Sequence, residues 1–225
     1  MRFGITGTYS SGKTLTSLVV SHLLALPRTE ARTMREILPE AAPGKALEEV
    51  TSAQLIQMIV TRHTERVLHE HLKSPDFVSD GCSLQEWIYG SVRVKYGVNP
   101  NQSINMAQSE SVAKTDELAY FEQIMFELGN LFKRHVKQSF DLLAHLPNEL
   151  PLAKDGHRPV NEKFRSASDD LLKETFDELG IKYVIVGGSM EKRVERIVDI
   201  VGRKPVISVS EAIVRAQDEY NNLVL

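Results

Sequence analysis

The sequence predicts an α/β protein in which helices cover both faces of a parallel sheet. Short β-prone runs of apolar residues alternate with longer segments whose apolar residues recur at helical spacing. Strands separated by helices of this length pair in parallel through crossover connections, and such sheets are buried between two helical layers. The chain has 225 residues, 42% of them hydrophobic, which suffices for one such unit. We therefore expect a three-layer α/β/α sandwich forming a single domain over residues 1–225.

Five segments read as strands of this sheet, so we expect a five-stranded parallel arrangement. Most are short apolar runs closed by Gly or Pro, and the clearest begins at Lys182 and ends at Gly188. The five segments are residues 2–6, 28–31, 76–80, 140–146 and 182–188.

Helical spacing of apolar residues accounts for most of the remaining chain. The predicted helices cover residues 13–26, 47–72, 83–96, 112–136, a stretch ending at 179, 191–201 and 211–220. Residues 97–138 would form a mainly helical region on the side of a second substrate. The segment from about 148 to 166 is rich in Pro, Gly and charge, and we expect it to be an exposed lid.

A phosphate-binding loop directly follows the first strand. The segment matches the pattern G-x-x-x-x-G-K-[ST] and reads Gly7-Thr8-Tyr9-Ser10-Ser11-Gly12-Lys13-Thr14. Glycines allow the backbone to approach the phosphates closely, and backbone N–H groups converge on them at the start of the next helix. Lys13 would reach the β- and γ-phosphates, and the Thr14 hydroxyl would bind magnesium. ATP and Mg²⁺ are therefore the expected cofactors.

Asp80 ends a predicted core strand at the same sheet edge as the loop. A carboxylate there can hold magnesium or accept a proton from an attacking hydroxyl, and it can also cap the following helix. We interpret Asp80 as catalytic, with its roles as base and as metal ligand left open.

Charged residues after the first helix and in the lid are the further candidates. Glu30 could hold a sugar hydroxyl and Arg32 an acceptor anion, although both also suit a solvated turn with local ion pairs. Arg158 follows Asp155-Gly156-His157, and Arg165 lies a few residues later. A lid that delivers arginine can neutralise a moving phosphoryl group, so we expect both arginines to be catalytic.

Composition excludes several classes of protein. Twenty-seven basic and thirty acidic residues give a net charge of −3, which offers no overall attraction to nucleic acid or to an anionic membrane but leaves a local basic cleft open. No apolar run is long enough to cross a bilayer, and no signal peptide fits before the phosphate loop. The single cysteine, Cys82, is compatible with a reducing compartment. We expect a cytoplasmic protein that acts on a small molecule, and we leave open a homodimer.

The order of these motifs resembles the P-loop AAA-type ATPase and kinase family that includes the ribosylnicotinamide-kinase domain of the NAD regulator. The resemblance rests on the phosphate loop, the strand end at Asp80 followed by Tyr89 on the next helix, and three segments: Glu30-Ala31-Arg32, Asp155-Gly156-x-Arg158 and Val186-Gly187-Gly188-Ser189. It covers roughly residues 1–200, and more distantly the chain is similar to thymidylate kinase and deoxynucleoside kinases.

The resemblance implies a nucleoside- or nucleotide-kinase fold of the P-loop NTPase type. ATP would lie on the loop with its adenine near Gly188 and Ser189, and the acceptor would lie near Glu30, Arg32, Asp80 and Tyr89. In thymidylate-type kinases an arginine often follows the strand-end carboxylate, whereas this sequence has Gly81. That departure argues against a phosphate-bearing acceptor of the standard kind.

Two functions follow from these residues. The first is a kinase that moves the γ-phosphate of ATP to a nucleoside- or nucleotide-like small molecule. The second is an ATPase or switch that acts on a protein partner through the long helices at 47–72 and 112–136. Against the second, no glutamate directly follows Asp80 to polarise water, and no Asn/Thr-Lys-x-Asp motif for guanine follows any strand.

Overall fold

The structure is a computed structural model that describes residues 1–153 and 158–223. Its sheet has four parallel strands in the order β2-β1-β3-β4. The strands are β1 (Arg2–Thr6), β2 (Phe77–Asp80), β3 (Leu142–His145) and β4 (Tyr183–Ile185). The predicted α/β fold with a parallel sheet is confirmed, with one strand fewer than expected.

The missing fifth strand is a single bridge at the sheet edge. Arg28 pairs with Val78 in parallel, flanked by hydrogen bonds from Val78 N to the carbonyl of Pro27 and from Thr29 N to the carbonyl of Val78. After this bridge the chain bonds to a helix instead of the sheet, since Glu30 N donates to His69 Nδ1 at 3.0 Å. The pairing therefore ends after one residue.

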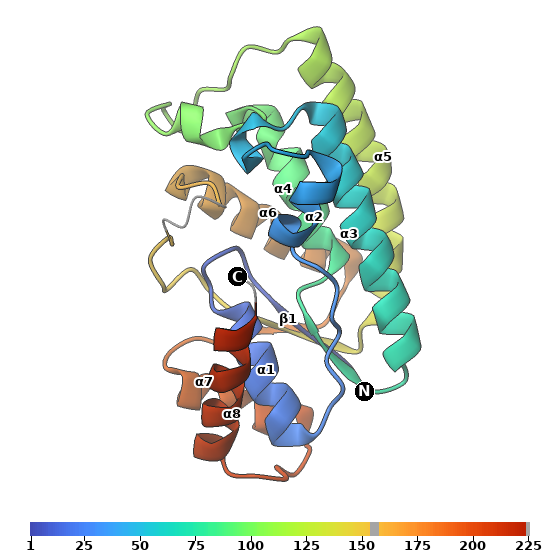
Figure 1. Cartoon of the computed structure of the whole chain (residues 1–225), viewed down its shortest axis with the longest axis vertical. Coiled ribbons are helices and arrows are strands. Elements are labelled where there is room, and N and C mark those ends of the chain that lie inside the picture. The colour runs from blue at the N-terminus through green and yellow to red at the C-terminus, as the bar shows by residue number, and fades with distance from the viewer. Residues whose placement is uncertain (154–157, 224–225) are drawn as a thin grey trace.

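Eight α-helices surround the sheet in the described part of the chain. They are α1 (Lys13–Leu24), α2 (Met34–Ala41), α3 (Ser52–Lys73), α4 (Ser83–Tyr96), α5 (Asp116–Ser139), α6 (Glu162–Leu179), α7 (Met190–Val201) and α8 (Val209–Asn222). Two short 3₁₀ turns, η1 (Leu47–Glu49) and η2 (Pro100–Ser103), precede α3 and follow α4. Figure 1 shows α3, α4 and α5 extending well beyond the sheet, whereas α1, α7 and α8 gather at its other end.

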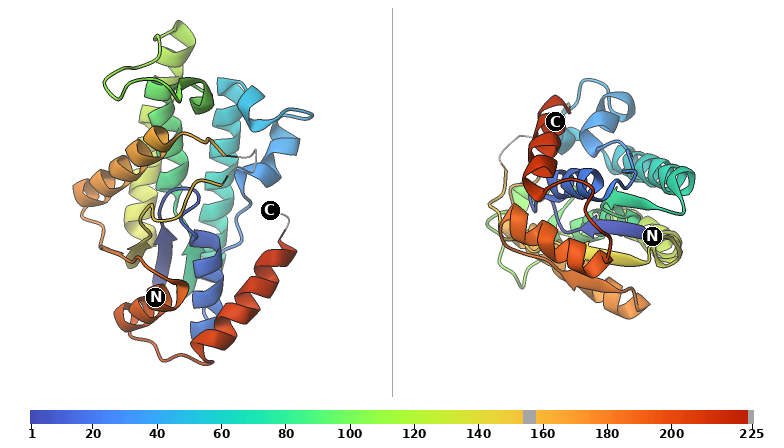
Figure 2. Two further views of the ribbon diagram at one scale, coloured as in Figure 1. Left: turned by 90° about the vertical axis from the view of Figure 1, so that its left-hand side faces the viewer. Right: turned by 90° about the horizontal axis from the view of Figure 1, so that it is seen from below.

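The sheet separates two hydrophobic cores. Alternate strand residues face opposite sides, so Phe77 and Leu143 join the core built with α2 to α6, whereas Val78 and Ala144 join the core of α1, α7 and α8. This division is the three-layer α/β/α arrangement, and Figure 2 shows α1 and α8 side by side in one of the helical layers.

Helix α2 is an element that the sequence analysis missed. No helix is expected from the sequence between residues 31 and 47, but a capping box between Thr33 and Glu36 starts a helix at Met34, and Pro39 lies inside it. The predicted lid of about 148–166 also needs correction, because α6 begins at Glu162. Residues 154–157 of that lid lie outside the described residues. The helical region expected over 97–138 contains η2 and most of α5.

Candidate functional site

The predicted phosphate loop connects β1 to α1 at the carboxyl edge of the sheet. Gly7 has φ of 135°, and a Cβ there would lie 2.6 Å from the Leu146 carbonyl and 2.8 Å from Ser11 Oγ, so no larger residue fits. Ser10 also has a positive φ, 59°. Lys13 Nζ reaches back across the loop to the carbonyl of Thr8 at 2.5 Å. The backbone therefore curls into the shape that the motif predicts for holding phosphates.

Lys13 is partly buried beside other cationic groups. Burial lowers the pKa of the Lys13 ammonium to about 8; Asp80 opposes this shift, and the guanidinium groups of Arg158 and Arg62 add to it. A phosphate anion next to this lysine would offset the repulsion from the arginines, so the loop is electrostatically prepared for a polyphosphate.

Thr14 and Asp80 meet at the start of α1. Thr14 Oγ1 donates to Asp80 Oδ2 at 2.7 Å, and Arg28 Nη2 lies 3.4 Å from the same oxygen. Burial favours the protonated form of Asp80, but Arg28 and Lys13 outweigh it and keep the pKa of this carboxyl below its usual range. A hydroxyl and an ionised carboxylate are oxygen ligands of the kind that magnesium prefers, so this pair fits the ion.

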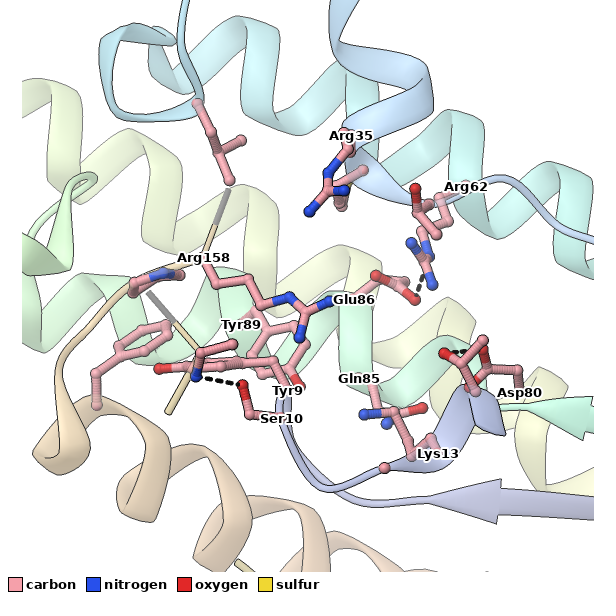
Figure 3. Close-up of a pocket in the computed structure, with 18 of the residues that line it drawn as sticks. Tyr9, Ser10, Lys13, Arg35, Arg62, Asp80, Gln85, Glu86, Tyr89 and Arg158 are labelled. Carbon is pink, nitrogen blue, oxygen red and sulfur yellow. Dashed lines mark hydrogen bonds and ion pairs between the residues drawn. The ribbon is translucent and has the colours of Figure 1, made fainter. Parts of the chain in front are cut away.

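A cavity of about 560 Å³ opens directly above the loop. Its floor includes Gly12, Lys13 and Thr14, and its far wall is built from α2, α3 and α4 (Figure 3). Arg35 of α2 and Arg62 of α3 reach into it from the wall opposite the loop, and Arg158 of the lid lies between them and Tyr9. Among the described residues, the basic ones that line the cavity are Lys13, Arg35, Arg62, Arg93 and Arg158, and the acidic ones are Asp80 and Glu86.

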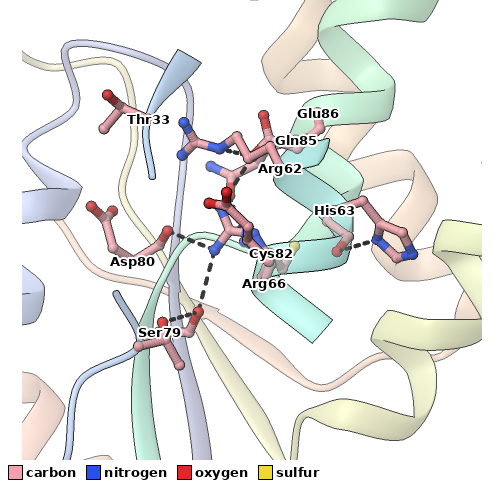
Figure 4. Close-up of polar contacts among 12 residues, drawn as sticks. Thr33, Arg62, His63, Arg66, Ser79, Asp80, Cys82, Gln85 and Glu86 are labelled. Carbon is pink, nitrogen blue, oxygen red and sulfur yellow. Dashed lines mark hydrogen bonds and ion pairs between the residues drawn. The ribbon is translucent and has the colours of Figure 1, made fainter. Parts of the chain in front are cut away.

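Glu86 organises the wall opposite the loop. Its Oε1 accepts from Arg62 Nε at 2.7 Å and from Arg66 Nη2 at 3.0 Å, and the Glu86 residue is 3% exposed (Figure 4). Arg66 also donates through Nη1 to the carbonyl of Asp80 at 2.9 Å, which ties α3 to the end of β2. The cluster fixes the position of Arg62 relative to Asp80.

Gln85, one residue before Glu86, connects this wall to the phosphate loop. Its side-chain oxygen accepts from Cys82 N at 2.7 Å, and its amide donates to the carbonyl of Gly7. Movement of the loop is therefore linked to the first turn of α4, where Glu86 lies. Cys82 itself is buried, and burial raises the pKa of its thiol to about 12, so it is an unreactive core residue.

Three aromatic rings form another side of the cavity. Tyr9, Tyr89 and Phe164 lie with ring centroids 5.6–6.4 Å apart, and all three line the cavity. The Tyr89 hydroxyl is buried with no hydrogen-bond partner among the described residues. Arg93 supports this side because its guanidinium lies 5.3 Å from the Phe164 ring centroid and donates to the Tyr89 carbonyl at 2.7 Å.

The described residues at the start of the predicted lid lie against the phosphate loop. Ala153 N donates to Ser10 Oγ at 3.1 Å, and Leu150 and Pro151 line the cavity. Arg165, 1% exposed, donates to the Leu150 carbonyl at 2.8 Å and approaches Thr8 Oγ1 at 3.4 Å. Its Nη2 is buried without a partner in the described part of the chain. Arg158 therefore faces the cavity, whereas Arg165 lies behind the loop and holds the lid to it.

Four predicted ligands outside the phosphate loop do not line the cavity. Glu30 is exposed, and Arg32 pairs with Glu65 and Glu40, because the chain at this point is bound to α3 and α2. Gly188 N donates to Glu149 Oε2 at 2.8 Å, and Ser189 caps the start of α7. The positions next to Arg32 that do line the cavity are Thr33, Met34 and Arg35.

Arg193 explains how the segment of Gly188 and Ser189 is connected to the site. Its guanidinium donates to the carbonyls of Ser11, at 2.9 Å, and Gly188, at 2.8 Å, and it pairs with Glu149. This segment therefore supports the phosphate loop from behind.

The family of the chain follows from comparison with known sequences. A model of the AAA-domain family matches residues 2–193, which include the phosphate loop, Asp80 and Arg193. The chain therefore belongs to the AAA-domain family. No curated protein matches it.

Solved structures show which fold this AAA domain shares. It is similar to deoxyadenosine kinase from M. mycoides with bound dCTP, at 14% identity and a TM-score of 0.58, and to the same enzyme with bound dATP, at 18% identity and a TM-score of 0.58. Each alignment covers 90% of this chain and 99% of the kinase. The AAA domain thus has the P-loop fold of a deoxynucleoside kinase.

Several residues of the AAA domain's cavity were not found from the sequence. Arg62 and Arg66 lie one helical turn apart on α3, and Glu86 lies on the first turn of α4. The only signal for them is the pair of arginines at i and i+4 on a helix with an apolar face, a spacing that places both side chains on one side. Arg35 was missed together with α2.

Proposed function

We propose that the chain is an ATP-dependent kinase that transfers the γ-phosphate of ATP to a nucleoside- or nucleotide-like small molecule. The observation that carries this proposal is the single cavity that joins the phosphate loop to an arginine-, glutamate- and tyrosine-lined wall on α2 to α4. A switch needs only the nucleotide side of such a cavity, whereas a kinase needs room for a second substrate beside the donor phosphate.

The residues have distinct roles in this proposal. Lys13 and the loop amides bind the donor phosphates, and magnesium held by Thr14 and Asp80 would neutralise charge on the β- and γ-phosphates. Arg158 covers the transferred phosphoryl group from the lid, and Arg165 keeps the lid attached to Thr8. The bonds to Asp80 and its lowered pKa suit a metal ligand better than a proton acceptor.

The aromatic rings of the cavity and the similar solved structures support a nucleoside- or nucleotide-like acceptor. Tyr9, Tyr89 and Phe164 offer flat apolar surfaces of the kind on which a base can stack. The similar deoxyadenosine kinase has been solved with dCTP, with dATP, and with dCMP and dCDP. The resemblance to the NAD regulator adds ribosylnicotinamide to the acceptors worth testing.

We also propose a cytoplasmic enzyme. Among the described residues no helix is long and apolar enough to cross a membrane.

An acceptor screen tests this function. The 225-residue protein is incubated with Mg·ATP and with single nucleosides, their 5′-monophosphates, or ribosylnicotinamide. ADP release is followed together with the mass of the product. We expect ADP release to depend on an acceptor and a product heavier by one phosphoryl group. Hydrolysis of ATP at the same rate with and without every acceptor would instead favour the ATPase alternative.

A further inference from the structure

The wall of the cavity opposite the phosphate loop contains a guanidinium group that the donor nucleotide does not account for. Arg62 comes from α3, and its side chain is only 15% exposed. Its Nε is bound to Glu86, whereas its two Nη groups have no hydrogen bond to any described residue. Figure 3 shows Arg62 and Arg35 on the side of the cavity away from Lys13. Two guanidinium groups therefore face the space beside the donor site.

Glu86 orients Arg62 but does not neutralise it alone. The same oxygen, Oε1, accepts hydrogen bonds from both Arg62 and Arg66, so one carboxylate is shared between two guanidinium groups. A mostly buried cation that is only partly compensated is costly, and an anion bound to its remaining N–H groups lowers that cost. Arg62 is thus held with its donor fork ready for an oxyanion.

The packing around Gly81 explains why the residue after Asp80 is not an arginine. A Cβ at Gly81 would clash with Gln85 Oε1 and would lie 3.4 Å from Arg66 Nη2. The space next to the strand end is therefore already filled by α3 and α4. Positive charge reaches this side of the cavity from α3 instead of from the strand end.

We propose that the acceptor carries a phosphate group of its own and that Arg62, with Arg35 beside it, binds this group. The inference rests on the proposed kinase function and makes the acceptor a nucleoside monophosphate. An oxygen of its phosphate forms a bond to the γ-phosphorus of ATP, the bond from that phosphorus to the β–γ bridging oxygen breaks, and ADP leaves with that electron pair. The attacking oxygen is already ionised, so no side chain has to remove a proton from it.

Paired acceptors test the inference on the 225-residue protein. Each nucleoside is compared with its own 5′-monophosphate, and ribosylnicotinamide with its mononucleotide, at saturating Mg·ATP. We expect kcat/KM to be at least ten-fold higher for the monophosphate of the preferred base, with a diphosphate as product. A nucleoside that is phosphorylated as efficiently as its monophosphate would overturn the inference and leave the kinase function intact. If no compound stimulates ADP release, the kinase function fails, and the inference fails with it.

Substitution of Arg62 tests the residue itself. Arg62→Met keeps an unbranched side chain that reaches about as far as the arginine Nε, removes the guanidinium group, and leaves Glu86 paired with Arg66. We expect the KM for the monophosphate to rise at least ten-fold, the KM for ATP to change less than two-fold, and the preference over the parent nucleoside to shrink. Arg134→Met is the matched control, because Arg134 is exposed on α5 and its Nε is bonded only to a carbonyl of its own helix. A loss of rate in Arg62→Met with unchanged preference would assign Arg62 a purely structural role and overturn the inference.

Discussion

Lys13 illustrates how one residue is prepared for its ligand by its surroundings. It is partly buried with guanidinium groups nearby, and desolvation lowers its pKa to about 8. A triphosphate favours the charged ammonium, so we expect nucleotide binding to restore the proton wherever the unliganded protein has lost it.

The lowered pKa of Lys13 predicts pH-dependent binding of Mg·ATP. Below pH 8 the lysine is already charged; above it, binding must take up a proton, so affinity falls by about ten-fold between pH 7 and pH 9. Calorimetry in buffers of different ionisation enthalpy measures both the affinity and the proton uptake. Lys13→Arg stays charged throughout this range, so any binding it retains should not vary in this way. Constant affinity and no proton uptake in the unmodified protein would contradict the prediction.

Substitution of Asp80 gives a second prediction about a single residue. Asp80→Asn keeps the shape of the side chain but removes the charge that faces Thr14 and Arg28. We expect nucleotide binding to change only a few-fold, while turnover falls by about 10–100-fold, as for other groups that hold or orient a metal. Steady-state rates at several magnesium concentrations provide the measurement. Asp141→Asn, which alters an exposed ion pair with Arg2, is the control; equal effects of the two changes would exclude a role for Asp80 in the site.

The residues that could be predicted from the sequence are those whose chemistry is contiguous in the chain. Lys13 and Thr14 belong to one eight-residue motif, and Asp80 was found because it ends an apolar strand. Arg62 and Glu86 are 24 residues apart and meet only when α3 packs on α4, so no local pattern marks them. Glu30 and Arg32 were predicted from their place after the first helix, but contacts with α3 hold them outside the cavity.

Helix α4 is the element that connects the two sides of the site. It starts beside the loop through Gln85, carries Glu86 and Tyr89 into the cavity, and packs along α5. Its bounds, Ser83 to Tyr96, agree with the sequence prediction because its apolar period is regular and Gly97 ends it. The bounds of α5 differ by a few residues, since Thr115 caps a start that periodicity alone does not reveal.

The α4–α5 contact predicts the effect of one substitution. A Cβ at Gly129 of α5 would lie 2.6–3.1 Å from atoms of the Trp87 indole ring, whose N–H donates to the Met125 carbonyl at 2.7 Å. We expect Gly129→Ala to lower the free energy of unfolding by about 1–3 kcal/mol, because overpacking outweighs the better helix propensity of alanine.

Chemical denaturation followed by the fluorescence of Trp87, the only tryptophan of the chain, measures this change. Asn130→Ala, at the exposed neighbouring position of the same helix, is the control and should be neutral or slightly stabilising. If the Gly129→Ala protein is as stable as the control, α4 and α5 can move apart enough to fit the added methyl group without a loss of stability, and the prediction is wrong.

At the scale of the whole molecule, the phosphate loop lies where the sheet, α1, the lid and α4 meet. Lys13 of α1, Ala153 of the lid and Gln85 of α4 each form a hydrogen bond to the loop. A ligand that binds this junction in the folded state and not in the unfolded chain stabilises the entire fold.

We therefore predict a rise in melting temperature with Mg·ATP. At a ligand concentration 100 times Kd the stabilisation is about 2.7 kcal/mol, which corresponds to roughly 5–10 °C for a protein of this size. Scanning calorimetry measures the shift, and Lys13→Met, which lacks the ammonium, should show none. A shift in that variant equal to that of the unmodified protein would mean that the nucleotide binds elsewhere.

The last helix gives the cavity a boundary that the AAA-domain match does not include. The match ends at residue 193, whereas α8 lies later in the chain, packs against α1 through Ala212 and Ala216, and contributes Gln217 and Tyr220 to the cavity lining. The lining of the cavity is thus partly built by a segment outside the region that the family model matches. Substitutions on α8 can change which acceptors fit the cavity without altering the residues of the phosphate loop. Helix α8 is therefore a suitable place to engineer acceptor selectivity.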